Sequence, residues 1–213
     1  GSQVAWSRSN SAVLSSGGTG MAYGIKSGTA TITASYLGLT AKSTVTVAGF
    51  VQSKSLVTPD GLTRTYSLYV PDGYHAGTPT PLVLTYHGGG GVALGMMYLS
   101  QLAPVARAHN FIVAFPNGTG TRPGFNGGGC CGEAAANGVD DVEFTRRMID
   151  DISSRYTIDA KRVYATGMSN GGVMVHRLGV QLADRIAAVA SVAGELFPGG
   201  DFVLTPPSRP VSV

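Results

Sequence analysis

A serine between two glycines, placed between a predicted strand and a predicted helix, constrains this chain more than any other feature. Residues 162–178 read RVYATGMSNGGVMVHRL, and Val163 to Thr166 predict a short buried strand. Gly167 to Gly171 fit the pattern G-x-S-x-G, and an apolar helical pattern follows. Because both flanking elements are present, this context favours a nucleophile on a sharp turn over a Gly-Ser turn that only caps a helix.

The predicted turn assigns roles to two residues. We expect Ser169 to occupy a strained backbone position at the carboxyl edge of a sheet. A side chain at position 167 or 171 would collide with the neighbouring strand or helix, which accounts for both glycines. The N–H of Asn170, at the start of the helix, would point at a developing oxyanion. Ser169 is therefore a candidate nucleophile, and Asn170 a candidate oxyanion-hole residue.

A second glycine run follows another predicted strand. Residues 81–86 (PLVLTY) predict a buried strand that runs into His87 and four glycines, residues 88–91. Glycines at this place would let main-chain N–H groups approach a substrate carbonyl, and Gly88 and Gly89 are the candidate donors. His87 is better interpreted as a structural residue than as the general base, because the base of such folds follows the nucleophile in the chain.

The remaining pattern of residues 49–213 alternates strands with helices. Continuous apolar runs in the strands predict an α/β fold with a largely parallel sheet that is covered on both faces. The glycine-rich residues 116–138 predict a long functional loop, and Asp140 or Asp141 is expected to cap the helix after it as a structural residue. We expect strands at 64–70, 81–86, 111–115, 163–166 and 186–192, and helices at 99–109, 141–156 and 170–182.

Residues 1–48 have a different pattern, with short period-two stretches separated by Ser, Gly and Asn turns. The pattern predicts a small, partial β-sandwich and a division into domains 1–48 and 49–213. The expected strands lie at 4–6, 12–14, 21–25, 28–34 and 43–47.

Charge and composition exclude several classes of function. Only 13% of the residues are charged, and the net charge of +3 comes from scattered Lys and Arg, so we expect no nucleic-acid partner. No apolar run is long enough for membrane insertion, and no pattern indicates a metal or another cofactor. A low-charge, Gly-rich chain suits a secreted, extracellular protein.

The two cysteines, Cys130 and Cys131, are adjacent in the sequence. By themselves they cannot form a four-ligand zinc site. They could form a vicinal disulfide, pair with cysteines outside this chain, or remain free, and the sequence does not rank these states. A catalytic thiol is disfavoured because no histidine lies near them in the sequence.

Four stretches together resemble one enzyme family. GLTRTYSLYVPDGY (61–74), YHGGGG (86–91), GGGCCGEAAANGVDDVEF (127–144) and RVYATGMSNGG (162–172) are similar to the polyhydroxybutyrate depolymerase and feruloyl esterase family. The resemblance implies an α/β-hydrolase that acts on carboxylic esters outside the cell. In residues 6–47, the order WSRSNSAV, GIKSGTATITA and STVTV resembles bacterial Ig-like domains of group 2, which implies a spacer or a surface-adhesion module.

The chain departs from that family at its end. The family's catalytic acid and histidine follow the strand expected at 186–192, so we expect them outside this chain, which looks truncated at both ends. Asp201 and Glu195 could be acids, but without a base they orient nothing. The four histidines, His75, His87, His109 and His176, are better interpreted as structural.

Three functional hypotheses follow from these features. The first is a secreted serine esterase that forms an acyl-enzyme on Ser169, whose substrates are polyesters of the polyhydroxyalkanoate type or feruloyl and acetyl esters of xylan, and whose activity is impaired in this chain. The second is a non-catalytic module that binds a polysaccharide or polyester surface. The third is a peptidase or thioesterase on the same scaffold.

Overall fold

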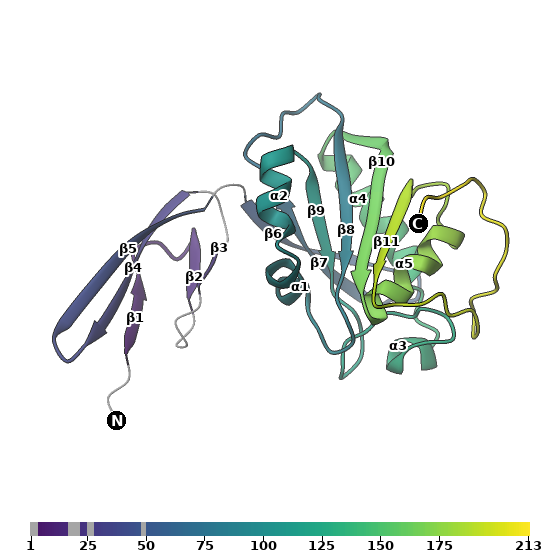
Figure 1. The fold of residues 1–213 in the computed structure, drawn as a ribbon, viewed down its shortest axis with the longest axis horizontal. Coiled ribbons are helices and arrows are strands. Elements are labelled where there is room, and N and C mark those ends of the chain that lie inside the picture. Colours follow the sequence, from purple (N-terminus) through teal and green to yellow (C-terminus); the bar gives the residue numbers. More distant parts are fainter. Residues whose placement is uncertain (1–3, 17–21, 25–27, 48–49) are drawn as a thin grey trace.

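The structure is a computed structural model that describes residues 4–16, 22–24, 28–47 and 50–213. Its strands form one large sheet and two small ones (Figure 1). The small sheets lie in the N-terminal part of the chain, and every strand after residue 50 belongs to the large sheet.

The N-terminal part contains a three-stranded antiparallel sheet in the order β1-β4-β5 and a two-stranded antiparallel sheet, β2-β3. Val13, Leu14 and Ala30 form a small core between them. The five strands overlap the five predicted ones, although positions 21 and 25 of the expected third strand lie outside the described residues. The bounds are β1 (Ala5–Arg8), β2 (Leu14–Ser16), β3 (Ala22–Gly24), β4 (Gly28–Tyr36) and β5 (Leu39–Val47).

The large sheet has six strands in the order β11-β10-β8-β9-β7-β6. The first four are mutually parallel, whereas β7 and β6 are antiparallel at one edge. The parallel part was predicted, but β6 was missed, and β7 was not expected to run antiparallel. The bounds are β6 (Phe50–Val57), β7 (Thr63–Val70), β8 (Thr80–Tyr86), β9 (Ile112–Pro116), β10 (Ile158–Met168) and β11 (Ala188–Val192).

Helices cover both faces of this sheet (Figure 1). The expected helix at 99–109 is wrong in its bounds, because Gln101 adopts a left-handed conformation and divides the segment into two helices. A short helix also lies within the expected loop at 116–138. The bounds are α1 (Ala93–Ser100), α2 (Leu102–His109), α3 (Gly132–Ala136), α4 (Asp141–Arg155) and α5 (Asn170–Gln181).

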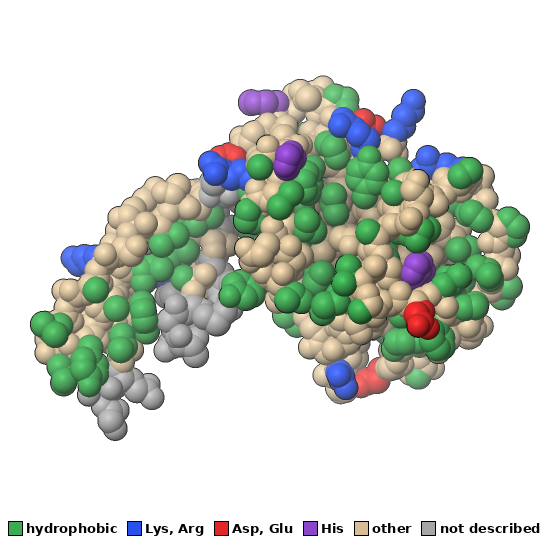
Figure 2. Space-filling view, viewed as in Figure 1, with side chains coloured by type: hydrophobic (Ala, Val, Ile, Leu, Met, Phe, Trp, Pro, Cys, Tyr) green, Lys and Arg blue, Asp and Glu red, His purple; other side chains and the backbone are tan. Residues whose placement is uncertain are grey.

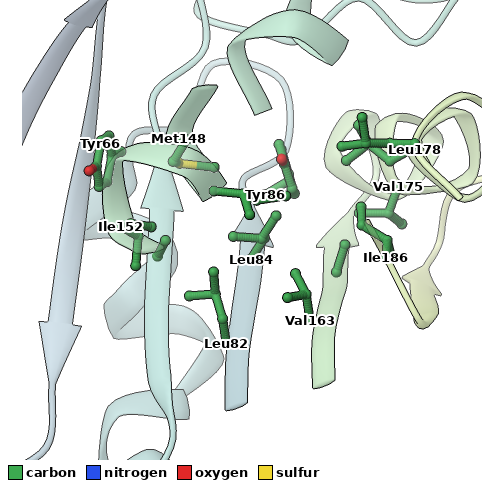
Figure 3. Close-up of a cluster of buried hydrophobic side chains, with 14 of the residues drawn as sticks. Tyr66, Leu82, Leu84, Tyr86, Met148, Ile152, Val163, Val175, Leu178 and Ile186 are labelled. Carbon is green, nitrogen blue, oxygen red and sulfur yellow. The ribbon is translucent and has the colours of Figure 1, made fainter. Parts of the chain in front are cut away.

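The alternation of side chains along β9 shows how the layers form. Ile112 and Ala114 point to one face and join the core that includes α4 and α5, part of which Figure 3 shows. Val113 and Phe115 point to the other face and pack with residues of α1 and α2. Because both faces are covered, the parallel strands read as continuous apolar runs in the sequence.

The parallel strands end at one edge of the sheet. There β8 leads into His87, β10 into Ser169 and β11 into Ala193. This edge, where the carboxyl ends of parallel strands meet, is where open α/β sheets bind ligands.

Charged side chains are sparse and scattered on the face of the molecule in Figure 2. Within the described residues, no helix is long and apolar enough to cross a membrane.

Candidate active site

Ser169 forms the turn between β10 and α5. Its φ of 53° and ψ of −119° are rare for a residue with a side chain. The Ser169 amide donates to the Val192 carbonyl at 2.8 Å, and its carbonyl accepts from the Val173 amide at 2.9 Å. These main-chain bonds hold the turn, while the residue itself stays exposed at the edge of the sheet.

Glycine is required on both sides of the serine. A Cβ at Gly167 would lie 2.3 Å from the Gly171 carbonyl oxygen. A Cβ at Gly171 would lie 2.4 Å from the Tyr86 carbonyl oxygen and 2.6 Å from that of His87. These neighbours are main-chain atoms and cannot rotate away, so helix α5 can approach β8 this closely only without side chains at the two positions.

The second glycine run lies directly beside the serine. A Cβ at Gly88 would be 3.5 Å from Ser169 Cβ, and one at Gly89 would be 4.0 Å from Asn170 Cβ. The Gly91 amide donates to the Gly88 carbonyl at 2.9 Å, which closes a tight turn. Within the described chain, the Gly89 and Asn170 amides donate no hydrogen bond to other residues, so both are free to meet a ligand oxygen.

His87 is buried, and both of its ring nitrogens are occupied. The Gly118 amide donates to Nε2 at 3.0 Å, so Nδ1 carries the proton and donates to the Gly88 carbonyl at 2.8 Å. Burial lowers the pKa of the His87 imidazole, which favours this neutral form. His87 therefore joins the glycine turn to the loop after β9 and has no free nitrogen to act as a base.

The Asn170 side chain has a role that the sequence analysis missed. It is buried, and its amide group bonds both main-chain groups of Phe125: Oδ1 accepts from the N–H, and Nδ2 donates to the C=O, both at 2.8 Å. One residue thus offers its main-chain N–H at the serine and fixes the neighbouring loop with its side chain. No local sequence pattern signals a pairing 45 positions apart.

A buried polar network anchors the same loop, and the sequence analysis missed it as well. Asp141 pairs with Arg64 at 2.5 Å and accepts from the Asn126 amide at 2.7 Å. Burial raises the pKa of the Asp141 carboxyl and the Arg64 charge opposes this shift. Asp140, rather than Asp141, caps α4, because its carboxylate accepts from the Glu143 amide. Asp141 instead ties the loop to the sheet.

The network continues to the C-terminal segment through Asn126. Its Nδ2 donates to Asp201, and its carbonyl accepts from Arg177 at 3.1 Å. Arg177 also makes two bonds to the Asp201 carboxylate, at 3.0 and 2.9 Å. Asp201, considered above as an acid, is therefore committed to a structural pair.

A pocket of about 870 Å³ opens beside the serine. It is large enough for an ester substrate. Its lining includes the nucleophile candidate, the oxyanion-hole candidates Gly89 and Asn170, and the cysteine pair. The other lining residues are Arg122, Gly124, Gly132, Glu133, Val173, Ala193, Gly194, Glu195 and Phe197.

The pocket lacks a histidine. All four histidines belong to the described part of the chain, and none of them lines it. His75 and His109 are exposed elsewhere, and His176 lies on α5, partly exposed. Among the described residues, no group of His, Cys, Asp or Glu could hold a metal ion. The pocket therefore combines the candidate nucleophile with the candidate oxyanion-hole amides, and none of the four histidines lines it.

Cys130 and Cys131 form a disulfide with each other. Of the three states that the sequence left open, the structure has the vicinal disulfide. The pair lies immediately before α3, on the wall of the pocket.

Comparisons with known proteins agree with this geometry. The family described as Esterase PHB depolymerase matches residues 64–204. Feruloyl esterase B of Piromyces equi is 40% identical over 139 residues, which cover 62% of this chain and 24% of that protein. The bifunctional acetylxylan esterase/xylanase XynS20E of Neocallimastix patriciarum is 29% identical over 115 residues, 54% of this chain and 16% of that protein.

A solved structure shares the fold. The CE1 ferulic acid esterase AmCE1/Fae1A of Anaeromyces mucronatus, in complex with ferulic acid, matches with a TM-score of 0.56 and 17% identity. The match covers 75% of this chain and 66% of that one. At this identity the likeness shows the α/β-hydrolase fold alone. The chain spans about a quarter of feruloyl esterase B.

Proposed function

We propose, from the premise that this chain belongs to the esterase PHB depolymerase family, that it is part of a serine carboxylic ester hydrolase. The observation that carries the proposal is the juxtaposition of Ser169, on its strained turn, with the free amides of Gly89 and Asn170. The Gly88 amide, in the same glycine run, is the third candidate oxyanion donor.

In the proposed reaction, Ser169 Oγ attacks the ester carbonyl carbon and gives up its proton to a base. The carbonyl oxygen becomes an oxyanion, which the main-chain amides stabilise. Collapse of this intermediate expels the alcohol and leaves an acyl group on Ser169, and water then releases the acid. Removal of one oxyanion-hole donor in such enzymes lowers the rate by about 10²–10³-fold.

The general base and the acid that orients it are proposed to come from residues outside these 213. Two observations support this: no histidine lines the pocket, and Asp201 is already paired with Arg177. Ser212, in the last residues of the chain, pairs in parallel with Ala188 of β11. A further parallel strand next to β11 would end at the same carboxyl edge of the sheet as β10, and the residues after it would lie on the same side of the molecule as Ser169.

The proposed substrates are carboxylic esters of polymers, either polyesters of the polyhydroxyalkanoate type or feruloyl and acetyl esters of xylan. The names of the two relatives, a feruloyl esterase and an acetylxylan esterase, support the second class. We also propose that the protein is secreted, which the disulfide supports. Residues 1–48 would then be an Ig-like spacer domain on the extracellular esterase.

One observation favours a second candidate, a non-catalytic module that binds a polysaccharide or polyester surface. A pocket without a base is what such a module would have. Gly167 and Gly171 favour the esterase, because they permit the close packing that holds Ser169 on its strained turn.

The test supplies the missing base from solution. The chain is treated with a fluorophosphonate, with and without imidazole, and the intact mass is followed. We expect one adduct on Ser169 that forms faster with imidazole, no adduct on Ser169→Ala, and an unchanged adduct on Ser153→Ala, whose serine is exposed on α4. Equal labelling of all three proteins would refute the nucleophile. The absence of any adduct, with retention on insoluble xylan or polyester, would favour the binding module.

A further inference from the structure

The Cys130–Cys131 disulfide stands apart from the proposed reaction. It supplies no nucleophile, yet both cysteines line the pocket that contains Ser169. Val173, Ala193 and Phe197 line the same pocket. The disulfide is thus part of an apolar lining beside the serine, whereas Arg122, Glu133 and Glu195 supply charged groups.

Three successive glycines place the disulfide against its neighbours. A Cβ at Gly127 would lie 2.5 Å from Val173 Cγ1, and one at Gly128 would lie 2.6 Å from Phe202 Cβ. A Cβ at Gly129 would lie 2.9 Å from the Pro198 carbonyl oxygen. Side chains at these positions would push the loop away from α5 and from the C-terminal segment. The glycines therefore let the loop pack closely against α5 and the C-terminal segment, with the half-buried disulfide on the wall of the pocket.

Hydrogen bonds that do not involve the sulfur atoms hold the same loop. The Gly128 amide donates to Asn126 Oδ1 at 3.0 Å, and the Gly129 amide donates to the Phe197 carbonyl at 2.9 Å. Asn126 is in turn fixed by Asp141 and Asp201. The part of the loop that leads into Cys130 is therefore anchored independently of the S–S bond.

We propose that the Cys130–Cys131 disulfide is a specificity-determining contact, which binds the flat apolar part of an ester whose carbonyl lies at Ser169. This inference rests on the proposed function for the position of the ester. Sulfur is polarizable, and a sulfur atom near an aromatic ring contributes about 2- to 10-fold in affinity. Together with Phe197 and Val173, the disulfide favours esters whose acyl group ends in an aromatic ring over esters of the same kind without the ring.

The contact is also sensitive to reduction. A dithiol such as dithiothreitol opens the S–S bond: its two thiols lose two hydrogens and become a cyclic disulfide, and Cys130 and Cys131 each gain one as thiols. Because the loop keeps its other anchors, we expect reduction to change the wall of the pocket and to leave the fold intact.

The experiment compares two esters that differ by one ring, methyl cinnamate and methyl crotonate. Their binding to the 213-residue chain is followed through the backbone amide NMR signals of Gly89 and Asn170, before and after treatment with dithiothreitol. We expect reduction to lower the affinity for methyl cinnamate about 2- to 10-fold and to leave the affinity for methyl crotonate unchanged. The double variant Cys130→Ala/Cys131→Ala should behave like the reduced protein and should not respond to dithiothreitol.

Two single variants complete the design. Phe197→Ala should also lower the affinity for methyl cinnamate. The variant keeps the main-chain carbonyl of residue 197, which accepts from the Gly129 amide, so the loop stays anchored. Val203→Ala removes an exposed apolar side chain that does not line the pocket, and it should change the affinity for neither ester.

Several results would overturn the proposal: unchanged methyl cinnamate affinity after the disulfide has opened, an equal loss for both esters, the absence of any shift at Gly89 and Asn170, or alkylation of both cysteines without a reductant. Fluorophosphonate labelling of Ser169 is measured separately. Labelling without any effect of the disulfide would refute this inference alone, and an effect of the disulfide without labelling would refute the catalytic role alone.

Discussion

A single buried histidine links two loops at the edge of the sheet, and its charge state is fixed by its partners. His87 accepts from Gly118 through Nε2 and donates to Gly88 through Nδ1. A second proton on the ring would have to displace the Gly118 amide, which is itself a donor. Burial opposes the charged form and depresses the pKa of His87 in the folded protein, although the hydrogen bond to the Gly88 carbonyl acts in the opposite direction.

This arrangement predicts how stability depends on pH. The unfolded imidazole has a pKa near 6.5, above that of the folded state, so the unfolded chain binds the proton first. The contribution of His87 to stability is therefore fully present above about pH 6.5 and falls as the pH drops toward the folded-state pKa. Between pH 7.5 and pH 5, the free energy of unfolding measured in urea should fall more for the wild type than for His87→Gln.

His75→Gln is the control, because His75 is exposed in a surface turn. It should keep the wild-type dependence on pH. If His87→Gln and the wild type lose equal stability between the two pH values, His87 is not a depressed buried group. We expect His87→Gln to cost about 1–3 kcal/mol at pH 7.5, since at least one of its two half-buried partners, Gly88 and Gly118, is left without its hydrogen bond.

At the scale of elements, the packing of α5 against β8 depends on the absence of side chains at the start of the helix. A Cβ at Gly171 would meet two main-chain carbonyls at the end of β8, whereas one at Gly179, two turns later in the same helix, would meet only side-chain atoms, those of Val189 at 3.4 Å and Val211 at 3.7 Å. Both glycines lie in the same helix, and they differ in the atoms that an added methyl group would meet. Alanine variants at the two positions therefore form a matched pair of test and control.

We expect Gly171→Ala to destabilise the protein by about 1–3 kcal/mol or more through overpacking, and to abolish labelling of Ser169, because the turn must move. Gly179→Ala should be neutral or should stabilise by up to about 1 kcal/mol, since alanine is the better helix former. The measurements are urea unfolding and fluorophosphonate labelling. Similar behaviour of the two variants would mean that the close approach of α5 to β8 does not set the turn.

The elements also show what could and could not be predicted from the sequence. The strand before Ser169, the helix after it and the glycine run at 88–91 were predictable because period and turn chemistry are local. Helix α1 and the division at Gln101 were not, because nothing in the apolar spacing marks a left-handed residue. The Asn170–Phe125 pair and the Arg64–Asp141 pair join residues 45 and 77 positions apart, and only the fold brings them together.

For the whole molecule, the distribution of buried apolar side chains is uneven. Among the described residues, the core of the N-terminal sheets buries three apolar side chains, whereas the main cluster of the large sheet buries twenty-one. Stability from burial rises with the apolar area removed from water. The N-terminal part is therefore expected to unfold under milder conditions than the large sheet, which fits the proposed division into domains 1–48 and 49–213.

The single tryptophan, Trp6 in β1, makes this difference measurable. In urea, the Trp6 emission should change at a lower concentration than the circular dichroism signal of the helices, because in the described part of the chain every helix lies between Ala93 and Gln181, in the part that contains the large sheet. Val13→Ala should shift only the first transition and Leu84→Ala only the second, by about 2–5 kcal/mol for the buried leucine. Coincident transitions that both variants shift together would show one cooperative unit, and the proposed division would then be wrong.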